Sequence, residues 1–204
     1  MRILMLGNSF TFYHGMPRLL AALTGAEVVA HTRGGASLSE QFNPETEMGA
    51  GTLKALREEK WDYVVLQDQS SITVRSPECF AENVAALCRL IRECGAVPVL
   101  YATWAYREGS EKLANLGVSY EEMARTIYDG YHRAAEENGA LVADVGKAFF
   151  DLTHEVAKND PKTFVKGSVD LLETDDFHPS AAGSVLAASV IAKTIENHRS
   201  KMSD

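Results

Sequence analysis

A serine near the start of the chain stands where a nucleophile could be held. Ser9 lies in the segment 7–11 (GNSFT), directly after a short apolar run and before a predicted helix. A serine on such a turn exposes its hydroxyl at the carboxyl end of a strand, with backbone N–H groups pointing the same way. This arrangement suits a nucleophile and half of an oxyanion site. The alternative interpretation is a serine that only caps the helix, since serine is a preferred N-cap residue.

A histidine near the end of the chain could supply the base that this serine needs. The sequence reads DDFHP from Asp175 on, and Pro179 suits the first turn of a helix expected over residues 181–197. Asp175 could turn back and accept a hydrogen bond from the imidazole of His178, whose other ring nitrogen would take the serine proton. Two alternatives stay open: a surface capping loop, and a metal site built from Asp175, Asp176 and His178.

Together the two segments resemble the first and last blocks of the SGNH (GDSL-like) hydrolases. That family carries G-[DN]-S after an N-terminal strand and D-x-x-H-P near its C-terminus, and the resemblance spans essentially the whole chain. It implies a serine hydrolase that cleaves carboxylic esters, with Ser9, Asp175 and His178 as catalytic triad and the N–H of Ser9 in the oxyanion hole. The GNSF start and the LQDQS block at 66–70 resemble a bacterial branch of the superfamily. At position 8 this sequence has Asn where many members of the family have Asp. That aspartate is not part of the family's triad.

The two middle blocks of the family would complete the oxyanion hole. The segment 33–37 (RGGAS) follows the second apolar run and resembles the glycine block, whose backbone N–H donates to the oxyanion. This resemblance assigns Gly35, with Gly34 next, while a flexible turn is the alternative interpretation of the glycine pair. Where the family has G-x-N-D, this sequence offers Gln69 or Gln67, whose amides carry the same NH₂ donor on a longer arm. Of the two, we expect Gln69 to take this role.

Aromatic side chains at the same edge could form the walls of a substrate pocket. Trp104 ends the fourth apolar run, and Phe10 and Tyr13 follow the serine, although core packing is an equally common role for such residues. The compact length and the lack of a hydrophobic lid segment favour a short acyl group, such as acetyl on a carbohydrate. Two other classes remain open: a metal-dependent phosphoesterase, and a non-catalytic ligand-binding domain on the same fold.

Regular alternation of apolar and amphipathic segments predicts the framework that positions these residues. The apolar runs, expected as strands buried on both faces, are 3–6, 27–31, 63–67, 97–103 and 140–145. Helical periodicity is present over 16–24, 51–60, 77–94, 119–138 and 181–197. The pattern predicts one α/β domain over 1–204, a three-layer α/β/α sandwich that is flavodoxin-like with a parallel sheet of about five strands. In such sheets ligands bind beyond the carboxyl ends of the strands.

Composition narrows the class of protein. The chain of 204 residues is 46% hydrophobic and carries a formal net charge of −8, which argues against a general nucleic-acid binder and gives no reason for attraction to anionic membranes. The odd cysteine count without C-x-x-C spacing predicts buried free thiols, not a disulfide framework or a zinc site.

No stretch reaches the ~18 apolar residues of a membrane span, and the N-terminus does not resemble a signal peptide. A cytoplasmic location is the resulting expectation. The predicted chemistry needs only side chains and water, so no cofactor or metal is expected, and the expected partner is a small-molecule or carbohydrate ester.

Overall fold

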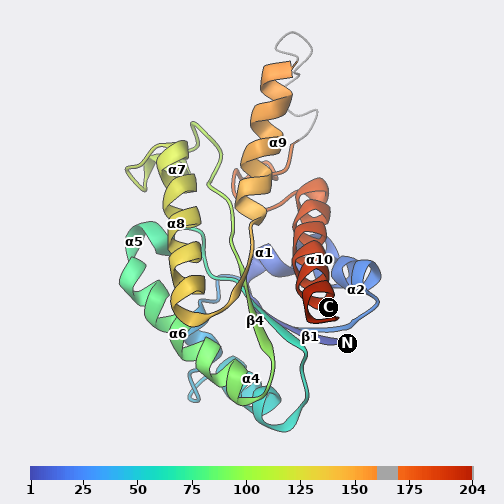
Figure 1. Cartoon of the computed structure of the whole chain (residues 1–204). Coiled ribbons are helices and arrows are strands. Elements are labelled where there is room, and N and C mark those ends of the chain that lie inside the picture. The colour runs from blue at the N-terminus through green and yellow to red at the C-terminus, as the bar shows by residue number, and fades with distance from the viewer. Residues whose placement is uncertain (160–169, 204) are drawn as a thin grey trace.

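A five-stranded sheet forms the centre of the molecule, in a computed structural model that describes residues 1–159 and 170–203 (Figure 1). Its strands are β1 (Arg2–Gly7), β2 (Glu27–Thr32), β3 (Tyr63–Leu66), β4 (Val97–Tyr101) and β5 (Leu141–Ala143). They are all parallel and lie in the order β2-β1-β3-β4-β5. This is the flavodoxin-like order. The predicted fold class is therefore confirmed.

Helices connect the strands. They are α1 (Ser9–Phe12), the 3₁₀ turn η1 (Tyr13–Gly15), α2 (Met16–Thr24), α3 (Leu38–Gln41), α4 (Glu47–Glu58), α5 (Ile72–Arg75), α6 (Pro77–Glu93), α7 (Glu111–Ala114), α8 (Tyr120–Asn138), α9 (Val145–Asn159) and α10 (Ala181–Ser203). α4 begins earlier than expected because Thr46 caps it and accepts a hydrogen bond from the N–H of Gly49. The helix α9 was not predicted, because the apolar run 140–145 holds both the short strand β5 and the first residue of this helix.

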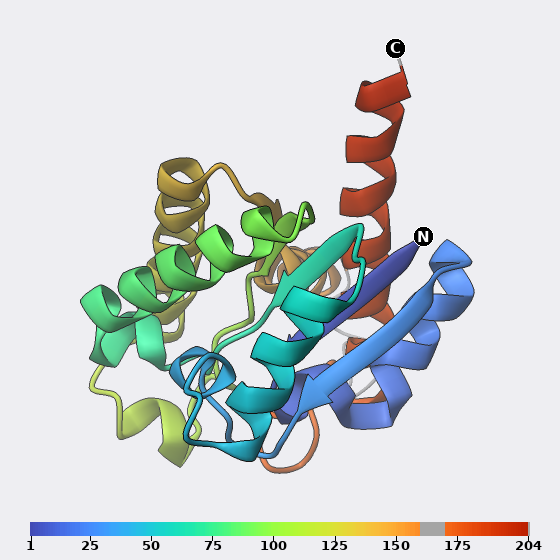
Figure 2. The same ribbon diagram turned by 90° about the horizontal axis from the view of Figure 1, so that it is seen from below.

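The side chains of the strands divide into two cores because neighbouring residues point to opposite faces of the sheet. On β1, Leu4 and Leu6 pack with the core under α4, α6 and α8, whereas Ile3 and Met5 pack with the core under α2, α9 and α10. Figure 2 shows helices on both sides of the sheet. All four side chains are fully buried. The five apolar runs predicted from the sequence thus form the middle layer, although the edge strand β2 is only half-buried.

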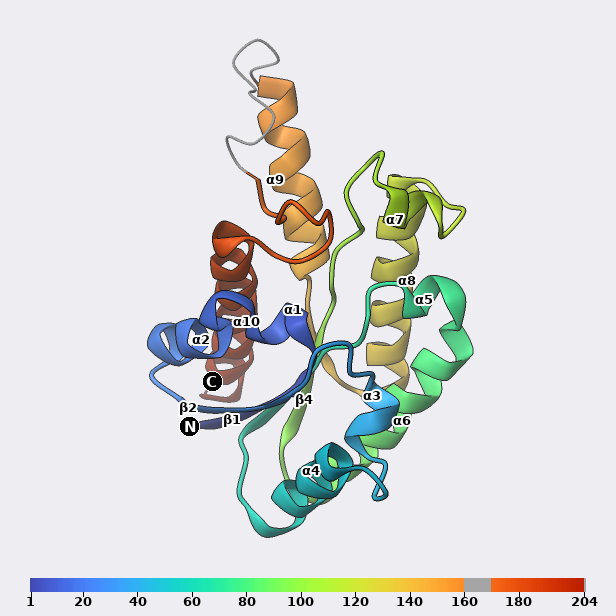
Figure 3. The ribbon, with the colours of Figure 1, turned by 180° about the vertical axis from the view of Figure 1, so that it is seen from behind.

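The direction of chain connection reverses beside β1. The chain passes from β1 to β2 on one side, and then crosses back to β3 on the other. At such a switch point the loops leaving neighbouring strands diverge and leave a crevice at the carboxyl edge of the sheet. β1 ends at Gly7 and β3 at Leu66. Figure 3 shows α1 at this edge, near the loop that leads into α10.

The three cysteines are free thiols with different surroundings. Cys88 is buried in α6, and burial raises the pKa of its thiol to about 11. Cys79 is exposed and Cys94 is half-buried, so the expectation of buried thiols is wrong for these two, which lie near the ends of α6.

Of the helices that the structure describes, none combines the length and the apolar character that crossing a membrane requires.

Candidate active site

The turn after β1 presents Ser9 without using its hydroxyl as a cap. Asn8 is the N-cap of α1, and its Oδ1 accepts a hydrogen bond from the N–H of Phe10 at 3.1 Å. The Asn8 Nδ2 donates to the carbonyl oxygen of Ala36 at 3.0 Å, which ties the turn to the loop after β2. The interpretation of Ser9 as a capping serine is therefore wrong. Its hydroxyl is left to interact with other groups.

Gln67, the residue after β3, is hydrogen-bonded to this turn. Its Oε1 accepts hydrogen bonds from the N–H of Asn8 at 2.9 Å and from the hydroxyl of Thr11 at 2.8 Å. Its Nε2 donates to the carbonyl oxygen of Asp68 at 2.6 Å, and the whole residue is buried. A side chain at Gly7 would collide with Thr11 Oγ1 and would bring its Cβ to 2.5 Å from Gln67 Oε1. Gln67 is fully buried, whereas Gln69 is partly exposed, so of the two amides that of Gln69 is the more accessible to a substrate.

Ser9, His178 and Asp175 lie in one chain of hydrogen bonds. The Nε2 of His178 is 2.8 Å from Ser9 Oγ, and its Nδ1 is 2.6 Å from Asp175 Oδ2. Asp175 Oδ1 also accepts the N–H groups of Phe177 at 3.2 Å and of His178 at 3.0 Å. The carboxylate thus accepts three hydrogen bonds, which fix the orientation of the imidazole. The imidazole in turn contacts Ser9, which lies 169 positions away in sequence. This order is the one in which a carboxylate orients an imidazole that can accept a serine proton.

The electrostatics of Asp175 favour its ionised form. Partial burial on its own would raise the pKa of this carboxyl group. The hydrogen bonds from the imidazole of His178 and from the N–H groups of His178 and Phe177 outweigh burial and hold the pKa below its ordinary value. Asp175 can therefore stabilise positive charge on the imidazole at neutral pH.

Aromatic rings surround the imidazole of His178. Tyr13 stacks on it with ring centroids 4.2 Å apart and an angle of 4° between the planes. Phe177 lies 4.0 Å away and Phe10 meets the imidazole edge-on at 5.7 Å. His14, the residue after Tyr13, adopts a left-handed backbone with φ of 50°, and its Nε2 lies 2.7 Å from Glu173 Oε1. Tyr13 was predicted as a possible pocket wall, but no sequence pattern indicated that it would stack on the histidine.

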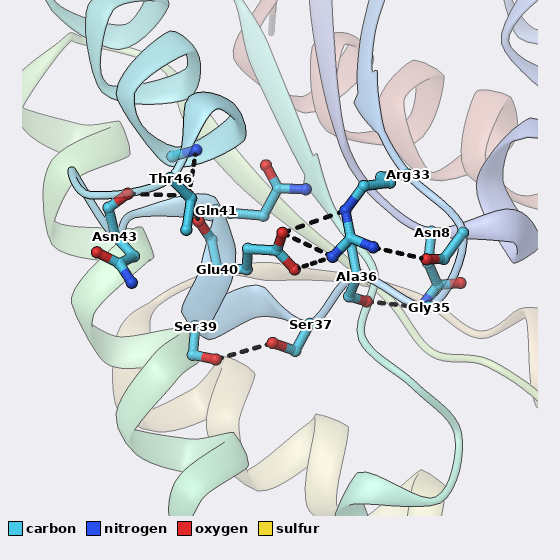
Figure 4. Close-up of polar contacts among 12 residues, drawn as sticks. Asn8, Arg33, Gly35, Ala36, Ser37, Ser39, Glu40, Gln41, Asn43 and Thr46 are labelled. Atoms are coloured by element: carbon cyan, nitrogen blue, oxygen red, sulfur yellow. Dashed lines mark hydrogen bonds and ion pairs between the residues drawn. The ribbon is translucent and has the colours of Figure 1, made fainter.

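The loop after β2 lies beside the serine turn. Gly35 has a φ of 73°, a conformation that glycine adopts without steric cost, and Gln69 Nε2 donates to its carbonyl oxygen at 2.8 Å. Figure 4 shows two contacts that join this loop to α3, the Arg33–Glu40 ion pair and the Ser37–Ser39 hydrogen bond. The two predicted oxyanion residues, Gly35 and Gln69, therefore lie in contact with each other. The Gln69 amide has a second N–H that its contact with Gly35 does not use.

Asp68 is a buried carboxyl group between the two glutamines. Its Oδ1 accepts the N–H of Gln69 at 2.8 Å, and the side chain is inaccessible to solvent. Burial raises the pKa of Asp68 to about 6, more than the hydrogen bonds from the backbone of Gln69 and Leu38 lower it. No sequence pattern distinguishes this residue from the other acidic residues.

Trp104 lies in the core beside the site. Its ring stacks between Phe10, at 4.9 Å, and Phe149, at 4.3 Å, and its Nε1 donates to the carbonyl oxygen of Phe177 at 3.0 Å. Trp104 also lines a cavity of about 330 Å³ between α8 and α9, whose other walls include Ile127. Since the triad residues do not line this cavity, a role for Trp104 and Phe10 in a substrate pocket stays a prediction.

The acidic side chains of the C-terminal loop have separate partners. Asp175 contacts His178, whereas Asp176 Oδ1 accepts a hydrogen bond from Arg107 Nε at 2.6 Å. Within residues 1–159 and 170–203, no group of three or more His, Cys, Asp or Glu side chains is arranged to hold a metal ion. The alternative of a metal site at Asp175, Asp176 and His178 finds no support in this geometry.

Comparison with known proteins assigns the chain to a family. No family model matches the sequence, and a search of curated proteins finds no relative. Among solved structures, a protein of Slackia heliotrinireducens described as an SGNH hydrolase is 45% identical, with a TM-score of 0.85 over 96% of this chain and 98% of that one.

Two more distant structures share the fold alone. A DUF4886 family protein from Bacteroides uniformis is 21% identical with a TM-score of 0.68, over 95% of this chain and 82% of that one. The acetyl xylan esterase AlAXEase is 14% identical with a TM-score of 0.65, over 96% of this chain and 100% of that one. The identity and full-length coverage of the Slackia heliotrinireducens protein show that this chain belongs to the SGNH hydrolases.

Proposed function

We propose that this protein is a serine esterase that cleaves a carboxylic ester through an acyl-enzyme on Ser9. The observation that carries the proposal is the continuous contact from Ser9 Oγ to His178 Nε2, at 2.8 Å, and from His178 Nδ1 to Asp175, at 2.6 Å. A serine hydroxyl is a poor nucleophile at neutral pH unless a neighbouring base removes its proton. Here the base is already within hydrogen-bonding distance.

In the first half of the reaction Ser9 Oγ attacks the ester carbonyl carbon while His178 Nε2 takes the hydroxyl proton. The Asp175 carboxylate stabilises the imidazolium that forms. The tetrahedral intermediate then collapses, the bond to the alcohol oxygen breaks, and that oxygen leaves with the proton from Nε2. In the second half, water gives its proton to His178 and attacks the acyl carbon, so that the carboxylic acid leaves and Ser9 recovers its proton.

The negative oxygen of the intermediate needs donors that are in place before the reaction. We assign the N–H of Ser9, the N–H of Gly35 and the second N–H of the Gln69 amide. The hydrogen bond from Gln69 to the Gly35 carbonyl supports this choice because it fixes the amide beside the glycine loop. The complete burial of Gln67 supports Gln69, which is partly exposed, over Gln67. Loss of one such donor typically slows acyl transfer by about 10²–10³-fold.

The proposed substrate class is a short acyl ester, such as acetate on a carbohydrate hydroxyl. The compact chain and the aromatic rings of Tyr13, Phe10 and Phe177 packed around His178 favour a small acyl group over a long chain. An acetyl xylan esterase has the same fold, which makes this class compatible with the architecture. The reacting partner would be a small-molecule or carbohydrate ester, and the chemistry calls for no cofactor.

The test is hydrolysis of p-nitrophenyl esters from acetate to decanoate by the wild type and by Ser9→Ala, each with and without EDTA. We expect Ser9→Ala to lose at least about 10³-fold in kcat/KM, EDTA to have no effect, and acetate or another short ester to be preferred. Release of acetate from an acetylated xylan by the wild type would then address the carbohydrate class.

Ser200→Ala is the matched control, since Ser200 is exposed near the far end of α10 and its hydroxyl donates to the carbonyl oxygen of Glu196. Equal rates for the wild type and Ser9→Ala would remove Ser9 as nucleophile. Inhibition by EDTA would favour the metal-dependent alternative, and a preference for decanoate would contradict the short-acyl class.

A further inference from the structure

The loop at residues 170–180 carries both the acid and the base of the proposed triad. Asp176, which lies between Asp175 and His178, has a φ of 73°. Residues other than glycine rarely occupy this left-handed region, and they do so where surrounding contacts hold them. Inside the loop the N–H of Glu173 donates to the carbonyl oxygen of His178 at 2.8 Å. The backbone N–H of Asp176 also donates to the carbonyl oxygen of Glu173 at 3.1 Å. These two contacts close the loop, and the side chain of Asp176 takes part in neither.

Arg107 holds both the side chain and the carbonyl group of Asp176 from outside the loop. It follows β4, and its backbone N–H donates to the carbonyl oxygen of Asp176 at 2.9 Å while its Nε donates to Asp176 Oδ1 at 2.6 Å. Its Nη2 donates to both carboxylate oxygens of Asp170, at 2.9 and 3.0 Å. The same nitrogen lies 3.2 Å from the carbonyl oxygen of Glu173 and 3.4 Å from that of Leu172. One guanidinium therefore joins the start of the loop to the residue between the acid and the base.

The conformation of Asp176 decides where Asp175 points. With Asp176 left-handed, the chain turns back so that Asp175 Oδ1 accepts the N–H groups of Phe177 and His178. The other oxygen, Oδ2, then faces the imidazole Nδ1. A change at Asp176 would move the carboxylate and the imidazole together.

We propose that Arg107 is a positioning residue of the active site, which sets the Asp175–His178 pair by holding Asp176 and Asp170. This inference rests on the proposed function. The side chain of Arg107 is 23% exposed, so its ion pairs are shielded from water more than ordinary surface pairs are. The planar guanidinium reaches two carboxylates and two carbonyl groups at once, whereas the single ammonium of a lysine presents no such fork. Arg107 itself takes no part in bond making or proton transfer.

The experiment compares wild type, Arg107→Ala and Arg107→Lys in the hydrolysis of p-nitrophenyl acetate. Misplacing a catalytic group by about 1 Å can cost on the order of 10²-fold, so we expect kcat/KM to fall by about 10–100-fold in the alanine variant and by less in the lysine variant. The rate at which a fluorophosphonate labels Ser9 should fall in parallel. This second readout requires the nucleophile but no particular ester.

A double-mutant cycle with Asp175→Asn separates positioning from a general loss of structure. If Arg107 acts through the Asp175–His178 pair, Arg107→Ala should cost less than about 3-fold once Asp175 is already replaced, because residues that act as a unit are not additive. The same 10–100-fold loss in both backgrounds would overturn the inference. If Arg107→Ala does not fold, the cycle is made with Arg107→Lys.

Two controls complete the design. Arg2→Ala removes an arginine that also pairs with two carboxylates, those of Glu27 and Glu59. Arg2 begins β1, at the end of the strand away from Ser9, so the rate should be unchanged. An inactive Ser9→Ala with a fully active Arg107→Ala would refute the role of Arg107 and leave the proposed function intact. Equal rates for wild type and Ser9→Ala would refute the proposed function, and this inference with it.

Discussion

Replacing Gln67 by leucine should separate the scaffold of the serine turn from its chemistry. Leucine has nearly the same volume as glutamine but cannot accept the hydrogen bonds from the N–H of Asn8 and the hydroxyl of Thr11. A buried donor left without a partner costs about 1–3 kcal/mol, so the two donors together should lower the free energy of unfolding by about 2–6 kcal/mol. For a chain of this size, each kcal/mol lowers Tm by roughly 2–4 °C.

The assay is urea unfolding of wild type and Gln67→Leu, with Ser70→Ala as matched control. Ser70 lies in the same block and is equally buried, but its hydroxyl has no hydrogen-bond partner among the described residues. Removing it should be neutral or slightly stabilising, since an unsatisfied buried hydroxyl already carries a desolvation cost. A loss below about 1 kcal/mol in Gln67→Leu, or an equal loss in Ser70→Ala, would refute the hydrogen-bond account of this block.

Three further changes test other parts of the site. Gly7→Ala should reduce both the free energy of unfolding and kcat/KM, because the added Cβ would collide with Thr11 and Gln67. Wild-type values in the unfolding and hydrolysis assays would show that the turn tolerates a side chain. Tyr13→Ala should lower kcat/KM by roughly 10-fold with little change in Tm, because the ring that stacks on His178 is lost and the imidazole is less well oriented; an unchanged rate would rule out this role. Asp68→Asn should flatten the dependence of stability on pH. The pKa of Asp68 is raised from 3.8 to about 6 on folding, so the folded state keeps a proton that the unfolded chain releases, and stability is lost as pH rises between those values. Above about pH 6 the asparagine variant should be more stable than wild type by up to about 3 kcal/mol in urea unfolding, and the opposite order would contradict the assignment.

The layers of the fold were predictable from local patterns. Buried parallel strands produce continuous apolar runs, and glycines after helices mark their ends, as at Gly25 and Gly139, which both adopt the left-handed conformation. The end of an element was harder to predict where one apolar run served two elements. Val145 continues the run of β5 in sequence, yet it is the first residue of α9.

The candidate site was predictable only as far as its residues lie in short motifs. Ser9, Asp175 and His178 stand in two such segments, and the structure brings them together. The contacts that hold the segments are not local: Asn8 and Gln67 are 59 residues apart, and Arg107 and Asp176 are 69 apart. The residues next to Gln67 in sequence do not indicate that it supports the serine turn. The residues next to Arg107 likewise do not indicate that it supports the histidine loop. Sequence patterns carried no information on these pairs because their partners come together only when the sheet forms.

The central claim is that Ser9 becomes acylated with His178 as its base and Asp175 as the orienting acid. The most direct measurement is intact-protein mass spectrometry after acid quench during turnover of p-nitrophenyl acetate, followed by peptide mapping. Wild type should carry one acetyl group on the peptide that contains Ser9, Ser9→Ala should carry none there, and Asp175→Asn should acquire it at least about 10³-fold more slowly. Acetylation at another residue, or hydrolysis by the wild type and Ser9→Ala at the same rate, would contradict the account.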